Sequence, residues 1–307
     1  MSKVVVVGEI NVDLICQGYS AFPAPGREIL VDDFVTTLGS SSAICAAGLA
    51  RLGTDVVFVG KVGADLWGDY CLQAMSSAGI DVSRVRRDPL LKTGVTVSIT
   101  SAQDRALVSF PGSVAELSAD EVDDDALAGA DHLHVSSYFL QTKLRRGCSG
   151  LFARASAAGL TTSLDPGCDP EGRWDRDLLA TLREVDVFFP NELELAAITG
   201  EPDLAAGLRR LANGRTQTIV TLGASGCATL SDGELLPVPA FAIQPVDTTG
   251  AGDSFNAGFL HAKLSGLPLR ECLRWGAAAG SLSTRGLGGT ARQASIDEMR
   301  ALLAADR

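Results

Sequence analysis

Five residues near the amino terminus, Val4-Val5-Val6-Val7-Gly8, decide the fold class. A continuous apolar run that ends in glycine is typical of a strand buried on both faces, and such strands occur in parallel sheets covered by helices. Further short strand patterns alternate with helical patterns along the chain, at residues 56–59, 132–136, 161–164, 187–189 and 218–222. This alternation predicts an α/β protein with a doubly wound, mainly parallel sheet flanked by helices.

Two β-like segments, residues 28–37 and 93–110, interrupt this rhythm because no crossover helix follows them at once. The second contains a turn at 101–105 between two strand-like halves. We expect a small antiparallel β lid, formed by segments at about 14–38 and 92–112, over a pocket at the carboxyl ends of the main strands. The alternative is a pair of surface hairpins. The lid would belong to a single domain spanning residues 1–307.

Composition excludes several classes of protein. The chain has 307 residues, of which 46% are hydrophobic and 21% charged, and its formal net charge is −11. Such an acidic balance argues against a nucleic-acid-binding surface. The sequence shows neither a signal-peptide layout nor an apolar run long enough for a membrane. Seven dispersed cysteines without a CxxC pair indicate reduced thiols, so we expect a cytoplasmic protein.

The chemistry is concentrated in the stretch Asp247-Thr-Thr-Gly-Ala-Gly-Asp253. Gly250, Ala251 and Gly252 precede a helical pattern over residues 253–264, so their main-chain amides would lie at a helix amino terminus, where anions bind. Asp253 would place a carboxylate beside that anion site. A base that accepts a proton from an alcohol attacking phosphorus belongs at such a position. The alternative is an ordinary helix cap.

Two histidines, His132 and His134, lie two residues apart on an expected strand and so share a face. They could form half of a metal site, but no partner cluster of cysteine, histidine or carboxylate is evident. We therefore interpret them as structural residues of a strand.

With these pieces in order, the chain resembles the ribokinase-like (phosphofructokinase B-type) family of carbohydrate kinases over essentially its whole length. The resemblance rests on four motifs in the family's order: Gly8-Glu-Ile-Asn-Val-Asp13, Asn191-Glu-Leu-Glu194, Thr221-Leu-Gly-Ala-Ser-Gly226 and Asp247–Asp253. Each also has a plain structural explanation. Asp13 could stabilise a turn, Asn191 and Glu194 could cap a helix, and the glycines could form turns.

The resemblance implies an ATP-dependent phosphotransferase that acts on an alcohol group of a small sugar or sugar acid. Asp253 would be the catalytic base, and the amides of Gly250, Ala251 and Gly252 would stabilise the transferring phosphoryl group. The implied substrate-binding residues are Asn11, Asp13, Gly39, Ser40, Ser41, Phe110 and Asp253. The implied nucleotide-binding residues are Asn191, Thr221, Gly223, Gly226, Gly250 and Gly252.

The resemblance also implies metal ions and an assembly. Asn191 and Glu194 would hold Mg²⁺ through water, since Mg²⁺ favours few carboxylates and several waters. Asp247 and Thr249 would neighbour a monovalent cation such as K⁺. A homodimer formed through the lid is expected from the family, and an exposed β edge is consistent with it.

The substrate side departs from the family pattern. Sugar-binding members usually carry a Gly-Gly pair followed by an Asn, but here Ser40 follows Gly39 and Ile44 replaces the Asn. Isoleucine forms no hydrogen bond, so one polar contact to a sugar is missing. Ser40 and Ser41 could supply hydroxyls, or could simply cap the following helix. Gly167 also stands where many relatives have Asn.

Three alternatives remain open at this point. A nucleoside kinase of the same family would need aromatic residues to stack a base, for which Phe34 and Phe110 are candidates. A non-catalytic nucleotide- or sugar-binding protein would not need Asp253. A dinucleotide-dependent oxidoreductase is disfavoured because Gly8-Glu9-Ile10 lacks the Gly-x-Gly-x-x-Gly turn.

Overall fold

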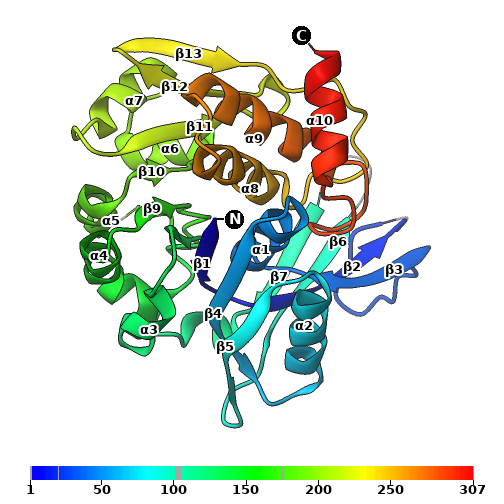
Figure 1. Ribbon diagram of the computed structural model, residues 1–307. Coiled ribbons are helices and arrows are strands. Elements are labelled where there is room, and N and C mark those ends of the chain that lie inside the picture. Colours follow the sequence, from blue (N-terminus) through cyan, green and yellow to red (C-terminus); the bar gives the residue numbers. More distant parts are fainter. Residues whose placement is uncertain (1, 20, 101–104, 175, 307) are drawn as a thin grey trace.

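The computed structural model describes residues 2–19, 21–100, 105–174 and 176–306 (Figure 1). Within them, nine strands form one sheet in the order β13-β12-β11-β10-β9-β8-β1-β4-β5. Every pairing from β11 to β5 is parallel, and β12 and β13 add an antiparallel hairpin at one edge. The mainly parallel sheet is thereby confirmed. The strands are β1 (Lys3–Val7), β4 (Asp55–Gly63), β5 (Asp81–Asp88), β8 (His132–Val135), β9 (Thr161–Leu164), β10 (Val187–Phe188), β11 (Gln217–Thr221), β12 (Cys227–Ser231) and β13 (Glu234–Val238).

Helices cover both faces of this sheet (Figure 1). One face carries α1 (Ser41–Arg51), α2 (Leu66–Ser77), α8 (Ala251–Leu264) and α9 (Leu269–Ser283), with α10 (Ile296–Ala305) packed on α9. The other carries α3 (Asp124–Leu127), α4 (Thr142–Ala157), α5 (Asp177–Thr181), α6 (Glu192–Thr199) and α7 (Leu204–Leu211). Short 3₁₀ turns lie at Gly112–Ala115, Ala119–Glu121, Leu182–Glu184 and Gly223–Ser225.

The central strand β1 divides the core into two layers. Val4 and Val6 pack with α1, α2, α8 and α9, whereas Val5 and Val7 pack with the helices of the opposite face. All four valines are fully buried, which explains their unbroken apolar run. Because β1 pairs in parallel with both β4 and β8, the residues that follow these strands lie together at the carboxyl ends of the strands.

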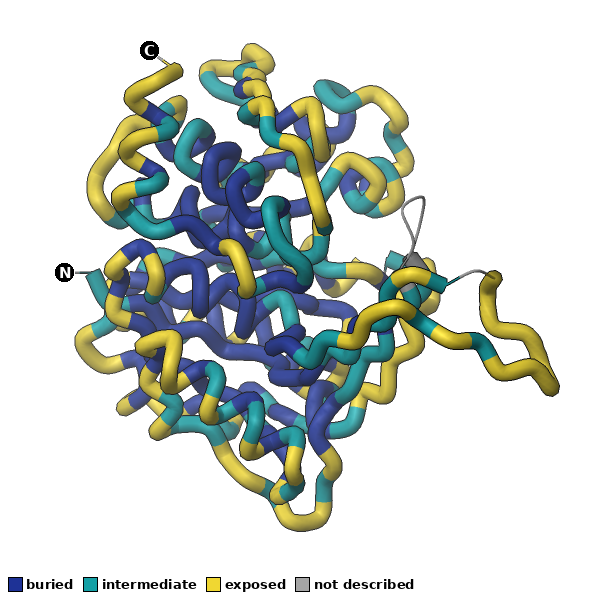
Figure 2. The backbone as a smooth tube through the Cα atoms, turned by 90° about the vertical axis from the view of Figure 1, so that its right-hand side faces the viewer, coloured by how far each residue is buried: buried dark blue, intermediate teal, exposed yellow. Residues whose placement is uncertain are grey.

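The lid is a separate four-stranded sheet in the order β3-β2-β6-β7. Its strands are β2 (Asn11–Gln17), β3 (Asp33–Leu38), β6 (Gly94–Thr100) and β7 (Arg105–Phe110). The two outer pairs are antiparallel, and the central β2–β6 pair is parallel. The lid segments project sideways from the buried core, and many of their residues are exposed (Figure 2).

Two details of the lid differ from expectation. The lid sheet starts at Asn11, so Asp13 lies within strand β2 and not in a turn. Residues 28–32 are not part of a strand, and β3 begins only at Asp33. The lid sheet starts this early because β2 leaves the main sheet immediately after Ile10 and pairs with both β3 and β6. Of the turn expected at 101–105, residues 101–104 lie outside the described residues, and Arg105 begins β7.

A chain of buried hydrogen bonds runs along β8 and β9. Its members, in order, are Thr161, His132, Ser163, His134 and Ser136, with 2.7 Å between neighbouring polar atoms. Thr161 also donates to a main-chain carbonyl, so its oxygen accepts from Nδ1–H of His132, and every later bond then has a fixed direction. Each imidazole therefore donates once and accepts once, as a neutral ring does.

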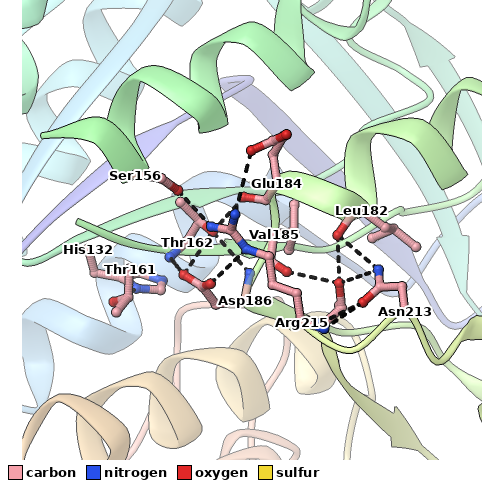
Figure 3. Close-up of polar contacts among 11 residues, drawn as sticks. His132, Ser156, Thr161, Thr162, Leu182, Glu184, Val185, Asp186, Asn213 and Arg215 are labelled. Atoms are coloured by element: carbon pink, nitrogen blue, oxygen red, sulfur yellow. Dashed lines mark hydrogen bonds and ion pairs between the residues drawn. The ribbon is translucent and has the colours of Figure 1, made fainter. Parts of the chain in front are cut away.

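The outer end of this chain lies beside a second polar network at the amino-terminal ends of β9, β10 and β11 (Figure 3). There Arg215 pairs with Asp186 at 3.1 Å, and Asp186 accepts from the main chain and hydroxyl of Thr162. Burial lowers the pKa of His132 well below its usual range and that of His134 to about 3. Both histidines thus serve the core as neutral hydrogen-bonding groups.

We predict that this neutral state makes the fold sensitive to acid. As pH falls below about 6.5, the unfolded chain binds a proton at His134 that the folded chain excludes, so folding loses stability. Between pH 7 and pH 5, the free energy of unfolding should fall by about 2 kcal/mol more in the wild type than in His134→Gln. Urea unfolding at both pH values measures this, and equal pH dependence in the two proteins would contradict it.

Candidate active site

Three adjoining cavities lie at the carboxyl ends of the parallel strands. The lid cavity, about 320 Å³, is lined by lid residues together with Ser41, Gly250 and Asp253. The middle cavity, about 240 Å³, is lined by Asp165, Glu194 and the start of α8. The outer cavity, about 560 Å³, lies between the β11–β12 turn and α9.

Shared residues join the three cavities into one cleft. Gly250 and Asp253 line both the lid cavity and the middle cavity. Thr221 and Gly252 line both the middle cavity and the outer cavity. The beginning of α8 therefore lies at the junction between a space under the lid and a space at the far side of the sheet.

Gly250 shapes this junction because it adopts the left-handed conformation, with φ 71°. A Cβ atom there would lie 2.8 Å from Cα of Gly289 and 3.0 Å from Ile44, so only glycine fits without strain. Ala251 donates its amide to the carbonyl of Thr248 at 3.2 Å. Within the described part of the chain, the amides of Gly250 and Gly252 form no hydrogen bond. Of the three amides expected to form an anion site, that of Ala251 therefore already has a main-chain partner.

Asp253 occupies the first turn of α8 beside other carboxylates. Burial raises the pKa of Asp253 well above its usual range, and the nearby carboxylates of Asp165, Glu9 and Asp13 raise it further, while a hydrogen bond from Ser41 opposes the shift. A carboxylate whose pKa is raised binds protons more readily near neutral pH. That property suits a general base.

Two more carboxylates of the middle cavity show the same effect. The pKa of Asp165 is raised to about 6, mainly by burial, although Asn256 donates to it at 2.7 Å. The pKa of Glu194 is raised to about 8 by burial and by Asp165, with a smaller contribution from Asp253. Burial, with a further contribution from neighbouring carboxylates, thus favours the protonated forms of these groups.

Asn191 and Glu194 form a reciprocal cap at the start of α6. Oδ1 of Asn191 accepts from the amide of Glu194 at 2.9 Å, and Oε2 of Glu194 accepts from the amide of Asn191 at 2.8 Å. The capping interpretation is therefore correct for both residues. Both also line the middle cavity, so capping does not remove them from the site.

The inner face of the lid carries a line of polar side chains. Asn11 donates through Nδ2 to Asp13 at 3.0 Å and to Thr96 at 3.1 Å, and Thr96 lies 3.0 Å from the hydroxyl of Ser109. All four line the lid cavity, as does Phe110. Sequence reasoning missed both residues, since Thr96 meets Asn11 only through the parallel β2–β6 pairing and Ser109 meets Thr96 only through the antiparallel β6–β7 pairing.

The serine-rich turn is used mainly by the fold. Ser40 caps α1 by accepting from the amide of Ala43 at 3.1 Å, and it donates its hydroxyl to the carbonyl of Glu9. Gly39 does not line the lid cavity; a Cβ there would lie 2.2 Å from the carboxylate of Asp13. Ser40 and Ser41 both line the cavity, and Ser41 also forms a hydrogen bond with Asp253.

The glycines of the β11–β12 turn differ in role. Gly226 has φ 99°, and a Cβ there would lie 2.1 Å from the carbonyl of Val238, so the hairpin itself requires glycine. Gly223, with φ 55°, faces open space. Both line the outer cavity with Thr221. Asp165, Asn256 and Glu9 also belong to the cleft, but only tertiary folding brings them to it.

Asp247 connects the loop before α8 to the loop at residues 285–290. Its Oδ1 accepts from the amide and hydroxyl of Thr249 at 2.9 and 2.8 Å, and its Oδ2 accepts from the amide of Gly288 at 2.8 Å. Thr249 lines the lid cavity, whereas Asp247 lines none of the three cavities. Asp247 therefore contributes to the site indirectly, by fixing the loop before α8.

We predict opposite consequences for two neighbouring glycine substitutions. Gly250→Ala should reduce the free energy of unfolding by at least about 1 kcal/mol, because of its positive φ and its contacts. Gly252→Ala meets no atom within 4 Å, so stability should be kept, but the new methyl group should weaken anion binding in the cleft. Chemical unfolding and nucleotide calorimetry measure both, and equal loss of stability in the two variants would contradict the distinction.

Comparison with known proteins agrees with this geometry. The family described as pfkB family carbohydrate kinase matches residues 1–295. A fructokinase of Klebsiella pneumoniae is 34% identical over 272 residues, 84% of this chain and 83% of the relative. An ATP-dependent ribose-1-phosphate kinase of Halopiger xanaduensis is 30% identical over 314 residues, 99% of this chain and 98% of the relative. The structure of Arabidopsis thaliana ribokinase complexed with ribose and ATP matches with a TM-score of 0.86 and 27% identity, covering 99% of each chain. The chain belongs to the pfkB family of carbohydrate kinases.

Proposed function

We propose that this carbohydrate kinase transfers the terminal phosphoryl group of ATP to an alcohol group of a small sugar, with residues 1–307 acting as one kinase domain. The observation that carries the proposal is the position of Asp253, which lines both the lid cavity and the middle cavity. An alcohol in the first and a phosphoryl group in the second would meet at this carboxylate. Relatives named fructokinase and ribokinase support the same reaction class.

The acceptor would occupy the lid cavity. Asp13, Asn11 and Thr96 form a hydrogen-bonded polar line there, and Phe110 lies at the same cavity. Such a line suits a molecule with several hydroxyl groups. The lid would exclude water from the reacting atoms, which strengthens the electrostatic interactions of the site.

ATP would occupy the outer cavity and extend its phosphates into the middle cavity. The outer cavity offers apolar side chains such as Phe241, Ile243 and Ala277, which suit the faces of a purine ring. Gly252 and Thr221 lie where this cavity meets the middle one. The structure of a ribokinase II of E. coli in complex with ATP and Mg²⁺, 23% identical, has the same fold.

The residues of the middle cavity fit a hydrated Mg²⁺ ion. No group of three or more His, Cys, Asp or Glu side chains among the described residues is arranged to hold a metal ion directly, and Mg²⁺ usually keeps several waters. Glu194 and Asp165, together with Asn191, would hold its water shell. When bound, Mg²⁺ supplies positive charge to the phosphates.

The protein itself supplies little positive charge to the cleft. No lysine, arginine or histidine is among the described residues that line the three cavities. The amides of Gly250 and Gly252, at the positive end of the α8 dipole, are therefore the protein groups that can stabilise the transferring phosphoryl group. Asp253 would accept the proton of the attacking alcohol through a carboxylate oxygen.

We predict that Asp253→Asn lowers kcat by about 10³-fold, because an amide cannot accept the proton, while ATP binding stays within a few-fold. Asp232→Asn, at the exposed β12–β13 turn, is the matched control and should keep full activity. In the wild type, kcat should rise with pH, because the raised pKa of Asp253 keeps it protonated at mildly acidic pH. Steady-state kinetics across pH provide the measurement. Full activity of Asp253→Asn would refute the role of this carboxylate.

We also propose that K⁺ binds near Asp247 and Thr249. Support comes from the three hydrogen bonds that Asp247 accepts, two from Thr249 and one from the amide of Gly288, which fix the loop before α8. A cation there would hold the amides of Gly250 and Gly252 in place. Replacing K⁺ by tetramethylammonium should lower kcat several-fold at constant ionic strength, and an unchanged rate would exclude the site.

A homodimer through the lid is a further part of the proposal. Phe34 and Val108 of the lid are 55% and 64% exposed, and outward apolar side chains beside open sheet edges favour pairing with a second copy. Light scattering should show a dimer for the wild type and a monomer for Val108→Glu. Leu30→Glu, exposed but outside the lid strands, is the control that should remain dimeric. A monomeric wild type would rule the dimer out.

A further inference from the structure

We propose that the acceptor is an uncharged polyhydroxy compound, so that sugar acids and sugar phosphates are poor substrates. The inference rests on the proposed function, because it concerns the molecule that enters the lid cavity beside Asp253. It narrows the acceptor class that the sequence leaves open, a sugar or a sugar acid.

The charge of the lid cavity is the first reason. Its described lining contains three carboxylates, those of Glu9, Asp13 and Asp253, and no lysine, arginine or histidine. Glu9 is buried, and Asp13 and Asp253 are half-buried. Water therefore cannot screen these groups fully, so an anion among them is repelled strongly. An uncharged acceptor meets no such repulsion.

Two cations that follow the cavity wall in sequence are paired with carboxylates. Leu140 lines the lid cavity, and α4 follows it with Lys143 and Arg145. Lys143 forms an ion pair with Glu116. Arg145 forms one with Asp177 at 2.6 Å and lies over the ring of Phe139. Neither side chain lines the cavity, so neither offsets its negative charge.

Hydrogen-bonding capacity is the second reason. Asn11 uses its amide hydrogens on Asp13 and Thr96, which leaves its carbonyl oxygen as an acceptor. Thr96 accepts a hydrogen bond from Asn11. The Thr96–Ser109 pair uses one of its two hydroxyl hydrogens on its mutual bond and can donate only the other to a ligand. Acceptors need donors on the ligand, and sugar hydroxyl groups supply them. Carboxylates and phosphate dianions have no hydrogen to donate.

Apolar side chains complete the wall. Ile15, Ile44, Leu107 and Leu140 line the same cavity. Ile44 is 3% exposed and lies against Gly250 and Gly289, so it cannot turn away to admit water. A charge placed against such a wall loses hydration without compensation.

Residues 101–104 read Ser-Ala-Gln-Asp and contain no cation. Arg105, whose side chain is not described, begins β7 at the end opposite Phe110. It is therefore included as a variant in the test.

The test compares kcat/KM for matched neutral and anionic acceptors with the full chain and MgATP. The pairs are ribose with ribose 1-phosphate, and sorbitol with gluconate. The neutral member of a pair that is turned over should be favoured by about 100-fold or more. An anionic member that equals or exceeds its neutral partner would overturn the proposal, whether or not Arg105→Ala reverses that preference.

A charge-introducing variant tests the cause directly. Ser109 is exposed at the cavity edge, so Ser109→Lys should be tolerated and should raise the anionic-to-neutral ratio of kcat/KM by about tenfold or more. Ser109→Gln, of similar length and uncharged, should leave the ratio unchanged. A ratio that stays the same in Ser109→Lys would show that charge does not decide the acceptor.

Acceptor binding, measured by calorimetry without nucleotide, separates this inference from the proposed function. Tighter binding of the neutral member without turnover of either would contradict the proposed function and support the inference. Tighter binding of the anionic member would overturn the inference even if both members were phosphorylated.

Discussion

The main physical constraint on the cleft is a group of carboxylates that no cationic side chain of the described lining neutralises. Asp165, Glu194 and Asp253 share the middle cavity, and no cationic side chain is among the described residues that line it. Burial raises the pKa of each, and repulsion by neighbouring carboxylates, including Glu9, raises it further. In the proposed function, Mg²⁺ arrives with the nucleotide and, together with the helix amides, offsets this charge. Nucleotide binding would therefore change the protonation of the carboxylates.

The two sheets provide the frame for this arrangement. Asp165 and Asn191 lie close together at the carboxyl ends of the sheet strands, because β9 and β10 are parallel neighbours and both end there. The lid departs from the same edge through β2 directly after Ile10. Asp13 is thus carried on a lid strand, while Asp253 is fixed to the body on α8. A relative movement of the lid would change the distance between the acceptor's polar contacts and the base.

Sequence patterns predicted the parts of the molecule whose causes are local. Val4–Val7 is a buried strand because every residue is apolar, and Gly250 marks the start of α8 because only glycine fits its conformation. The edge strand β5 was not predicted, since Asp81–Asp88 contains mainly charged residues. Thr96 and Asp165 were not assigned to the site either, because their neighbours are distant in sequence and meet only through strand pairing.

The most direct measurement of the central claim is the number of protons released when Mg·ADP binds. Calorimetry at pH 7 in buffers of different ionisation enthalpy gives this number. With the pKa of Glu194 at about 8, the free cleft holds a proton at pH 7, and the charge of Mg²⁺ should expel it. The account predicts release of a substantial fraction of a proton by the wild type and much less by Glu194→Gln. Binding without proton release in the wild type, or with proton uptake, would contradict it.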